Sequence, residues 1–237
     1  MLNKYRFYTS PYFLNKFYLV RDIKYINKKY NFSGSLLDIG CGSKPYTDLF
    51  NKIKEYKGID FKDYLVNKDF WARKPDYFFS NGYSKTLTLP FKNESFDNVV
   101  SFQVLEHHPN PQKLISEMFR IVKKKGYILL TVPFLGGIHE EPHDYQRFTK
   151  YGLIELFKPY KCKILEIKEQ GALFSTISML LNEYLNNFAA KNKLFYFISV
   201  LIYLPFLLLS YVSLLLDKIF KSDKIFFNYL ILVKKNS

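Results

Sequence analysis

The sequence of 237 residues predicts an α/β fold, in which helices cover a doubly wound parallel sheet. Two observations predict this class. Short apolar runs of strand length alternate with segments of helical periodicity, and one of these runs ends in the turn Gly40-Cys41-Gly42. In parallel sheets a glycine turn of this kind follows the carboxyl end of a strand, where ligands bind. The length suffices for one such core with an addition.

The expected elements follow in chain order. Apolar residues at helical spacing, with basic residues between them, predict an amphipathic helix over residues 12–30. A second helix is expected to start near Pro45, directly after the glycine turn. Further helices are expected at residues 111–123 and 148–157, and strands at residues 35–39, 56–59, 77–79, 98–102, 127–132, 163–167 and 226–233.

Composition narrows the class of partner. The formal net charge of +14 favours an anionic partner, although a lysine-rich proteome would give the same balance. The lysines are scattered and form no RNA-binding signature, so we expect no nucleic-acid partner. The two cysteines, Cys41 and Cys162, form no disulfide framework and fit a reducing compartment. Residues 1–30 lack the continuous apolar core of a secretory signal.

Residues 194–216 break the alternation of strands and helices, because they carry no charge and have lysines on both sides. About 20 apolar helical residues cross roughly 30 Å of hydrocarbon, so this segment is a membrane candidate. A buried core helix is the alternative. Pro205 in the middle favours a break into two half-helices. The helix-like spacing of residues 173–188 leads into the segment.

Several motifs occur in a fixed order along the chain. They are Ser35-Leu-Leu-Asp-Ile-Gly-Cys-Gly42, Asp60, Leu89-Pro-Phe91, Ser95-Phe-Asp97, Gln103-Val-Leu-Glu-His107 and Glu141-Pro-His-Asp-Tyr-Gln-Arg-Phe-Thr149. The set resembles the class I S-adenosylmethionine (SAM) dependent methyltransferases, in particular the methyltransferase type 11-like family. The resemblance covers roughly residues 33–168 and 225–234. It implies a Rossmann-like, doubly wound seven-stranded sheet with SAM as the cofactor.

The same resemblance implies which residues hold the cofactor. The acid Asp38 suits an amine or a sulfonium, and Asp60 would accept the ribose hydroxyls. The acid that such families often carry near the adenine is replaced by Lys85, and Asn81 would substitute for it. The implied cofactor contacts are Asp38, Gly40, Cys41, Gly42, Tyr46, Asp60, Asn81 and Gln103.

The segment after the fifth strand would contact the acceptor. His143 or Asp144 is a candidate base for a hydroxyl acceptor, and Arg147 is a candidate for binding an anionic group of the substrate. The alternative is that Asp144 and Arg147 pair to fix the loop. All three are carried forward as candidate catalytic residues.

No metal is expected. His139 and His143 match the zinc-protease spacing H-E-x-x-H, but Pro142 disfavours the helix on which that spacing works. Glu106 and His107 resemble a divalent-metal site of some ubiquinone-type and small-RNA methyltransferases, although Gln103 replaces the first acid of that pattern. A cation bound there with a later histidine is the open alternative.

These observations divide the chain into an N-terminal helical extension (1–32), a SAM-binding core (33–168), a helical membrane-associated insertion (169–224) and a last strand with its tail (225–237). In the family, strands six and seven pair as a hairpin, so the insertion leaves and returns at one sheet edge. That topology favours a monotopic dip over a membrane crossing.

The leading interpretation is a SAM-dependent methyltransferase at the cytoplasmic face of a membrane. Its acceptor would be a glycan, polyprenyl lipid or quinone-like compound linked to lipid, with anionic membrane lipids as partners. The alternatives are a soluble small-molecule methyltransferase whose apolar segment caps a pocket, and a non-catalytic membrane scaffold of the same fold. The sequence leaves the oligomeric state open.

Overall fold

The computed structural model describes residues 10, 12–61, 73–79, 86–190, 193–220 and 224–237. The chain divides into two compact units. The sheet unit comprises residues 22–133, 138–168 and 229–237, and the helical unit comprises residues 1–21, 134–137 and 169–228. The site residues Asn81 and Lys85 discussed above lie outside the described residues.

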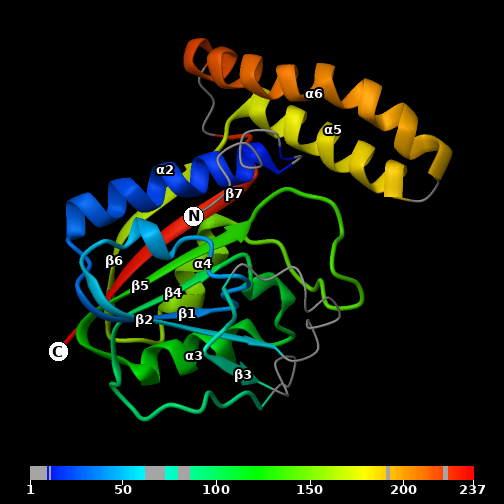
Figure 1. Ribbon diagram of the computed structural model, residues 1–237. Coiled ribbons are helices and arrows are strands. Elements are labelled where there is room, and N and C mark those ends of the chain that lie inside the picture. The colour runs from blue at the N-terminus through cyan, green and yellow to red at the C-terminus, as the bar shows by residue number, and fades with distance from the viewer. Residues whose placement is uncertain (1–9, 11, 62–72, 80–85, 191–192, 221–223) are drawn as a thin grey trace. The chain divides into compact units, whose positions relative to one another are not determined.

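A seven-stranded sheet in the order β3-β2-β1-β4-β5-β7-β6 forms the centre of the sheet unit (Figure 1). Neighbouring strands from β3 to β5 pair in parallel. Each predicted strand is found, with ends that differ by a few residues. The strands are β1 (Gly34–Ile39), β2 (Ile53–Phe61), β3 (Tyr77–Phe79), β4 (Phe96–Phe102), β5 (Val122–Pro133), β6 (Cys162–Gln170) and β7 (Asn228–Lys235).

The strand order reverses between β1 and β4, since β2 and β3 lie on one side of β1 and β4 and β5 on the other. In open α/β sheets ligands bind where the strand order reverses, so we expect the ligand site at the carboxyl ends of β1 and β4. Buried aliphatic side chains along the strands form the core, among them Leu36, Leu37, Val99, Val100, Ile128 and Leu130.

Helices α3 (Pro111–Ile121) and α4 (Lys150–Phe157) lie on one face of the sheet (Figure 1). Residues 22–30 of α2 (Phe13–Tyr30), which belong to the sheet unit, lie on the other face. Both α3 and α4 begin at a side-chain cap. The side chain of Asn110 accepts the N–H of Lys113 at 3.1 Å, and Thr149 accepts the N–H of Gly152 at 3.1 Å.

The prediction of an α-helix directly after Pro45 is wrong. The chain forms only a short 3-10 turn, η1 (Thr47–Leu49), before β2 begins at Ile53. The few residues between the glycine turn and β2 leave no room for an α-helix.

The helical unit contains α5 (Leu173–Ala190), α6 (Lys193–Ile219) and the first half of α2. Phe13, Leu14, Tyr18, Met179 and Phe227 form its buried apolar cluster. Within the residues that the structure describes, no helix is both long and apolar enough to cross a membrane.

The break expected at Pro205 is wrong, because α6 continues through this proline. A proline removes one backbone hydrogen bond, but a helix that packs along a neighbour tolerates that loss.

Candidate active site

The glycine turn lies directly after β1, and two of its residues depend on having no side chain. Gly40 has a φ of +70°, and a Cβ there would lie 2.3 Å from Cγ2 of Val104. Gly42 has a φ of +49°, and nothing lies within 4 Å of where its Cβ would stand. The first glycine therefore permits close packing, and the second leaves open space beside the backbone.

Asp60 joins the carboxyl end of β2 to this turn. Its Oδ2 accepts the N–H of Gly42 at 2.6 Å, and its Oδ1 accepts the N–H of Phe61 at 2.7 Å. Burial raises the pKa of Asp60. Each carboxylate oxygen has a second lone pair, so Asp60 can accept further hydrogen bonds from a bound ligand.

Asp38 is a buried acid in β1 with one oxygen unsatisfied. Its Oδ2 accepts the hydroxyl of Tyr56, whereas Oδ1 is buried and has no hydrogen-bond partner. Burial raises the pKa of Asp38 to about 7, and the charge of Asp60 adds to this effect. A buried carboxylate oxygen without a partner is costly, and a cationic ligand would relieve that cost.

The segment after β4 holds two further unsatisfied side chains. Gln103 has a φ of +56°, and its Nε2 is buried without a partner. Glu106, in the 3-10 turn η4 (Leu105–His107), is fully buried, and neither of its carboxyl oxygens has a partner. Burial raises the pKa of Glu106 to about 8, so its carboxyl group is largely protonated at neutral pH.

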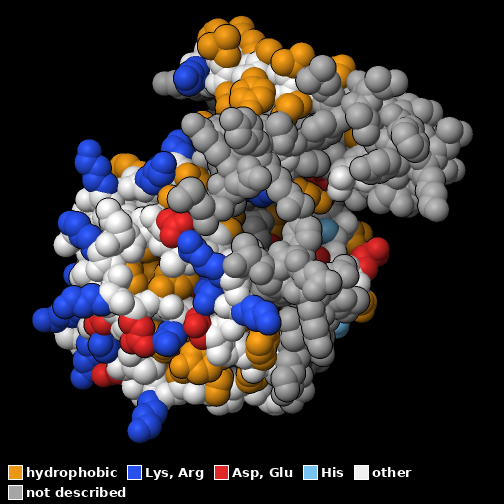
Figure 2. Space-filling model, in the orientation of Figure 1, with side chains coloured by type: hydrophobic (Ala, Val, Ile, Leu, Met, Phe, Trp, Pro, Cys, Tyr) orange, Lys and Arg blue, Asp and Glu red, His pale blue; other side chains and the backbone are white. Residues whose placement is uncertain are grey.

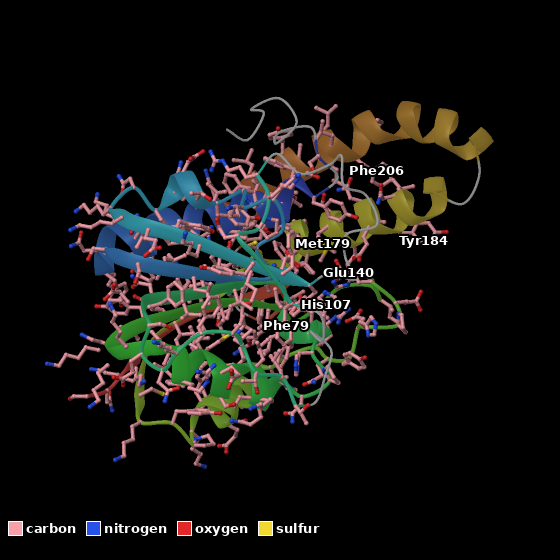
Figure 3. All side chains as sticks on the ribbon, turned by 60° about the horizontal axis from the view of Figure 1, so that its bottom comes forward. Phe79, His107, Glu140, Met179, Tyr184 and Phe206 are labelled. Atoms are coloured by element: carbon pink, nitrogen blue, oxygen red, sulfur yellow. The ribbon has the colours of Figure 1, made fainter. Side chains whose placement is uncertain are left out.

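His107 is held in one orientation by the backbone. Its Nδ1 lies 2.6 Å from the carbonyl oxygen of His143. A carbonyl only accepts, so we assign the proton to Nδ1, which leaves the lone pair of the neutral ring on Nε2. That Nε2 lies 3.2 Å from a carboxylate oxygen of Glu140, and the two side chains are neighbours in Figure 3.

Glu140 reaches His107 from a strained position. Its backbone φ is +58°, a value that residues other than glycine rarely adopt. Residues with such strained backbone angles are often found at functional sites. Partial burial raises the pKa of Glu140 to about 7, and the charges of Asp60 and Asp144 act in the same direction. Burial lowers the pKa of His107. The pair can therefore hold one proton between nitrogen and oxygen near neutral pH.

Asp144 and Arg147 form a bidentate ion pair, with N–O distances of 2.6 and 2.8 Å. Asp144 also accepts the N–H of His139 at 3.0 Å. The hydrogen bonds from Arg147 lower the pKa of Asp144 to about 2. A carboxylate of such low basicity is a poor proton acceptor, so the geometry favours the alternative in which the pair fixes the loop.

Three side chains could hold a metal ion. The ligand atoms of Glu106, His107 and His139 all lie within 4.8 Å of one another. The rings of His107 and His139 are perpendicular, with centroids 4.8 Å apart. Nitrogen and carboxylate ligands in this number suit a divalent transition metal. The zinc-protease spacing of His139 and His143 is not on a helix, as the sequence predicted.

Residues 37–130 match the family model described as a methyltransferase domain. This part of the chain is therefore similar to the methyltransferase domains of SAM-dependent enzymes, and we refer to it as the methyltransferase domain. A "probable S-adenosylmethionine-dependent methyltransferase" of Mycolicibacterium smegmatis is 32% identical over 99 residues, which cover 41% of this chain and 37% of the relative. The ubiquinone biosynthesis O-methyltransferase of Rickettsia typhi is 26% identical over 160 residues, which cover 59% of this chain and 63% of the relative.

An uncharacterised protein of Methanocaldococcus jannaschii is 32% identical over 122 residues, which cover 49% of this chain and 55% of the relative. The chain thus spans about half the length of the curated relatives it matches.

Solved structures share the fold of this methyltransferase domain. The 1,6-didemethyltoxoflavin-N1-methyltransferase of Burkholderia thailandensis, with bound S-adenosylhomocysteine, has a TM-score of 0.54 at 11% identity and covers 92% of this chain and 78% of its own. The [4+2]-cyclase SpnF has a TM-score of 0.56 at 16% identity, and the match covers 92% of this chain and 80% of SpnF. At this identity the likeness shows the fold alone.

The residues of the methyltransferase domain fit SAM. The unpaired oxygen of Asp38 suits an ammonium group, and the open space beside Gly42 admits a ligand against the backbone. Cys41 belongs to the same turn, and burial raises the pKa of its thiol, so it stays neutral. Tyr46 lies edge-on to Phe102, with ring centroids 5.4 Å apart.

The structure brings together residues that the sequence analysis kept apart. The sequence analysis left open a cation held by Glu106, His107 and a later histidine, and the structure places His139 beside this pair. Glu140, which the sequence placed only in the protease pattern, also lies beside His107. His143, a candidate base, contributes its carbonyl to His107, and its Nδ1 lies 3.0 Å from the hydroxyl of Tyr145. The adjacent Glu106 and His107 were the one sequence signal for this cluster.

Proposed function

We propose that the chain transfers a methyl group from SAM to a hydroxyl oxygen of its acceptor, with His107 and Glu140 as the proton-accepting pair. The observation that carries this proposal is the 3.2 Å approach of Glu140 to the Nε2 of a histidine whose Nδ1 is fixed by a backbone carbonyl. A hydroxyl acceptor must lose a proton during transfer, and such a pair accepts one.

When bound, SAM supplies an electrophilic methyl group. As the acceptor oxygen takes the methyl group, the bond from methyl carbon to sulfonium sulfur would break and S-adenosylhomocysteine would leave. The proton of the acceptor hydroxyl would pass to Glu140. His107 then shares the proton through Nε2, while the carbonyl of His143 keeps the ring aligned. Asp144 and Arg147 hold the loop that carries Glu140, and Asp38 and Asp60 orient the cofactor end of the site.

The acceptor that we favour is borne by a lipid, at the cytoplasmic face of a membrane. Two observations support this part of the proposal. The uncharged residues 194–216 are inserted between β6 and β7, and the chain has a net charge of +14. The relative from Rickettsia typhi is named an O-methyltransferase of ubiquinone biosynthesis, which is consistent with an oxygen acceptor on an apolar compound.

The test uses the full chain, methyl-labelled SAM and two acceptor pools, a hydroxyl-bearing membrane-lipid extract and a set of water-soluble phenols. We expect label in the lipid phase, and its loss in His107→Gln with SAM affinity retained. Label only in the water-soluble products would instead favour the soluble small-molecule methyltransferase. Retained turnover in His107→Gln would refute the proton-accepting pair. SAM binding without transfer to either pool would favour the scaffold.

A further inference from the structure

The paired helices α5 and α6 bury polar side chains and expose apolar side chains on their outer faces. Along α6, Ser210, Ser213 and Asp217 recur at helical spacing and are buried. The opposite side of α6 is exposed and apolar. Its residues are Leu208, Leu209, Val212, Leu215 and Ile219.

Helix α5 repeats the same inversion. Its buried polar residues are Ser175, Thr176, Ser178 and Asn182. Its exposed apolar residues, Ile177, Leu180, Leu181 and Tyr184, follow the spacing of one helix face, and Tyr184 is 66% exposed. A helix that packs in water normally turns its apolar stripe inward.

Hydrogen bonds link the two helices along their polar sides. The hydroxyl oxygens of Ser178 and Ser210 lie 3.0 Å apart, and Nδ2 of Asn182 donates to Ser210 at 3.0 Å. Asp217 accepts the N–H groups of Phe174 at 2.9 Å and Ser175 at 3.1 Å. Serine and asparagine contacts of this kind hold helices together where the surroundings are apolar.

The charges of the helical unit favour an anionic surface. In the described parts of α5 and α6 the acidic residues are Glu183 and Asp217, and both accept backbone N–H groups. Glu183 accepts the N–H of Gly137 at 3.1 Å, and Asp217 accepts those at the start of α5. Lys218, in the last turn of α6, is exposed next to Ile219 of the apolar face. A second copy of the chain would bring two basic edges together, whereas anionic headgroups would neutralise them.

From these observations we infer that the outer faces of α5 and α6 form a lipid-docking surface that lies in the interface of an anionic membrane. Figure 2 shows hydrophobic side chains gathered over α6, with a basic side chain beside them. In water, a continuous apolar stripe along two paired helices is costly, and burial in the interface removes that cost. The inference defines the surface behind the proposed membrane location, but it does not require methyl transfer.

The test is flotation of the full chain, without detergent, on vesicles of phosphatidylcholine and phosphatidylglycerol. We expect binding, and a loss of about tenfold or more when three exposed residues of α6 are changed together, Leu208→Gln, Val212→Gln and Leu215→Gln. The matched control is Tyr151→Gln, an exposed aromatic residue on α4 of the sheet unit. It should bind vesicles as the wild type does.

A second variant on α5, Ile177→Gln with Tyr184→Gln, replaces the first if the triple variant fails to fold by circular dichroism. Absence of wild-type binding, or full binding by the variants, would overturn the inference. So would a wild-type dimer that these substitutions dissociate without vesicles, because a second copy would then cover the surface. SAM affinity is measured by calorimetry on the same samples. Because it reports on the cofactor site and not on lipid binding, it distinguishes failure of the docking surface from failure of the proposed activity.

Discussion

The Nε2 atom of His107 and a carboxylate oxygen of Glu140 lie 3.2 Å apart, and neither residue is in a regular strand or α-helix. The histidine follows β4 and the glutamate follows β5, so two neighbouring strand ends supply the pair. Because parallel strands point their carboxyl ends to one sheet edge, this is where an acceptor and a cofactor would meet.

The first prediction concerns Glu140. Replacing it by Gln keeps the shape of the side chain but removes the proton acceptor, so the turnover number should fall by about 10²–10⁴-fold. The dissociation constant of SAM should change little, because no cofactor role is assigned to Glu140. Single-turnover kinetics measure the first quantity and calorimetry the second. Glu155→Gln, an exposed carboxylate on α4 paired with Lys158, is the control. A normal single-turnover rate in Glu140→Gln would exclude Glu140 as the acceptor of the proton.

The second prediction is a pH dependence of SAM affinity. An ammonium group binds the ionised form of Asp38, whose pKa in the free protein is about 7 because the carboxyl is buried. Affinity should therefore rise by about tenfold per pH unit below 7 and level off above it. In Asp38→Asn the affinity should be lower and its slope below pH 7 should disappear. Calorimetry between pH 5 and 8 measures both slopes. An unchanged slope in the variant would assign the titration to another group.

The third prediction concerns Asp60, which holds the N–H of Gly42 and is expected to accept the ribose hydroxyls. Asp60→Ala removes both interactions and should weaken SAM binding by about 1.5–3 kcal/mol. Asp48→Ala, an exposed acid of η1 that pairs with Arg73, is the control and should bind SAM normally. Equal calorimetric affinities in the two variants would contradict the role of Asp60.

The arrangement of the candidate cofactor residues was predictable because these residues are local. The acid Asp38, the turn from Gly40 to Gly42 and Asp60 belong to two consecutive strands, and each strand end can be recognised from its apolar run. The turn needs glycine for reasons of backbone geometry that the sequence expresses directly. The seven strands were predictable for the same reason.

The pairing of His107 with Glu140 was not predictable, because it depends on the loop after β5. Glu140 reaches His107 through a left-handed backbone conformation that no sequence pattern marks. Proximity to Arg147 in sequence left Asp144 open as a base or as an ion pair, and only the bidentate contact distinguishes the two. The course of α6 through Pro205 likewise depends on its pairing with α5.

The fourth prediction tests the role of the Asp144–Arg147 pair. Asp144→Asn weakens a bidentate contact to a buried carboxylate, so it should lower the free energy of unfolding by about 1–3 kcal/mol. The ion pair stabilises the folded protein and lowers the pKa of Asp144 to about 2. Its contribution is therefore present at neutral pH and is lost as the pH falls from about 4 towards 2. Urea unfolding at pH 7 and pH 3 should show a smaller difference between variant and wild type at the lower pH. A normal stability together with lost turnover would return Asp144 to a direct catalytic role.

The last prediction concerns the junction of α5 and α6. In the first turn of α5, the N–H groups of Phe174 and Ser175 both donate to the carboxylate of Asp217 on α6. Asp217→Ala leaves these donors unpaired in a buried place and should cost about 1–2 kcal/mol, as loss of a helix cap does. The effect should be local, because the contact lies within the helical unit. Amide hydrogen exchange should accelerate over the start of α5, while the strands β1, β4 and β5 keep their protection. Asp217→Asn keeps one oxygen acceptor and should give an intermediate effect. Unchanged exchange at Phe174 and Ser175 in Asp217→Ala would show that α5 does not depend on this contact.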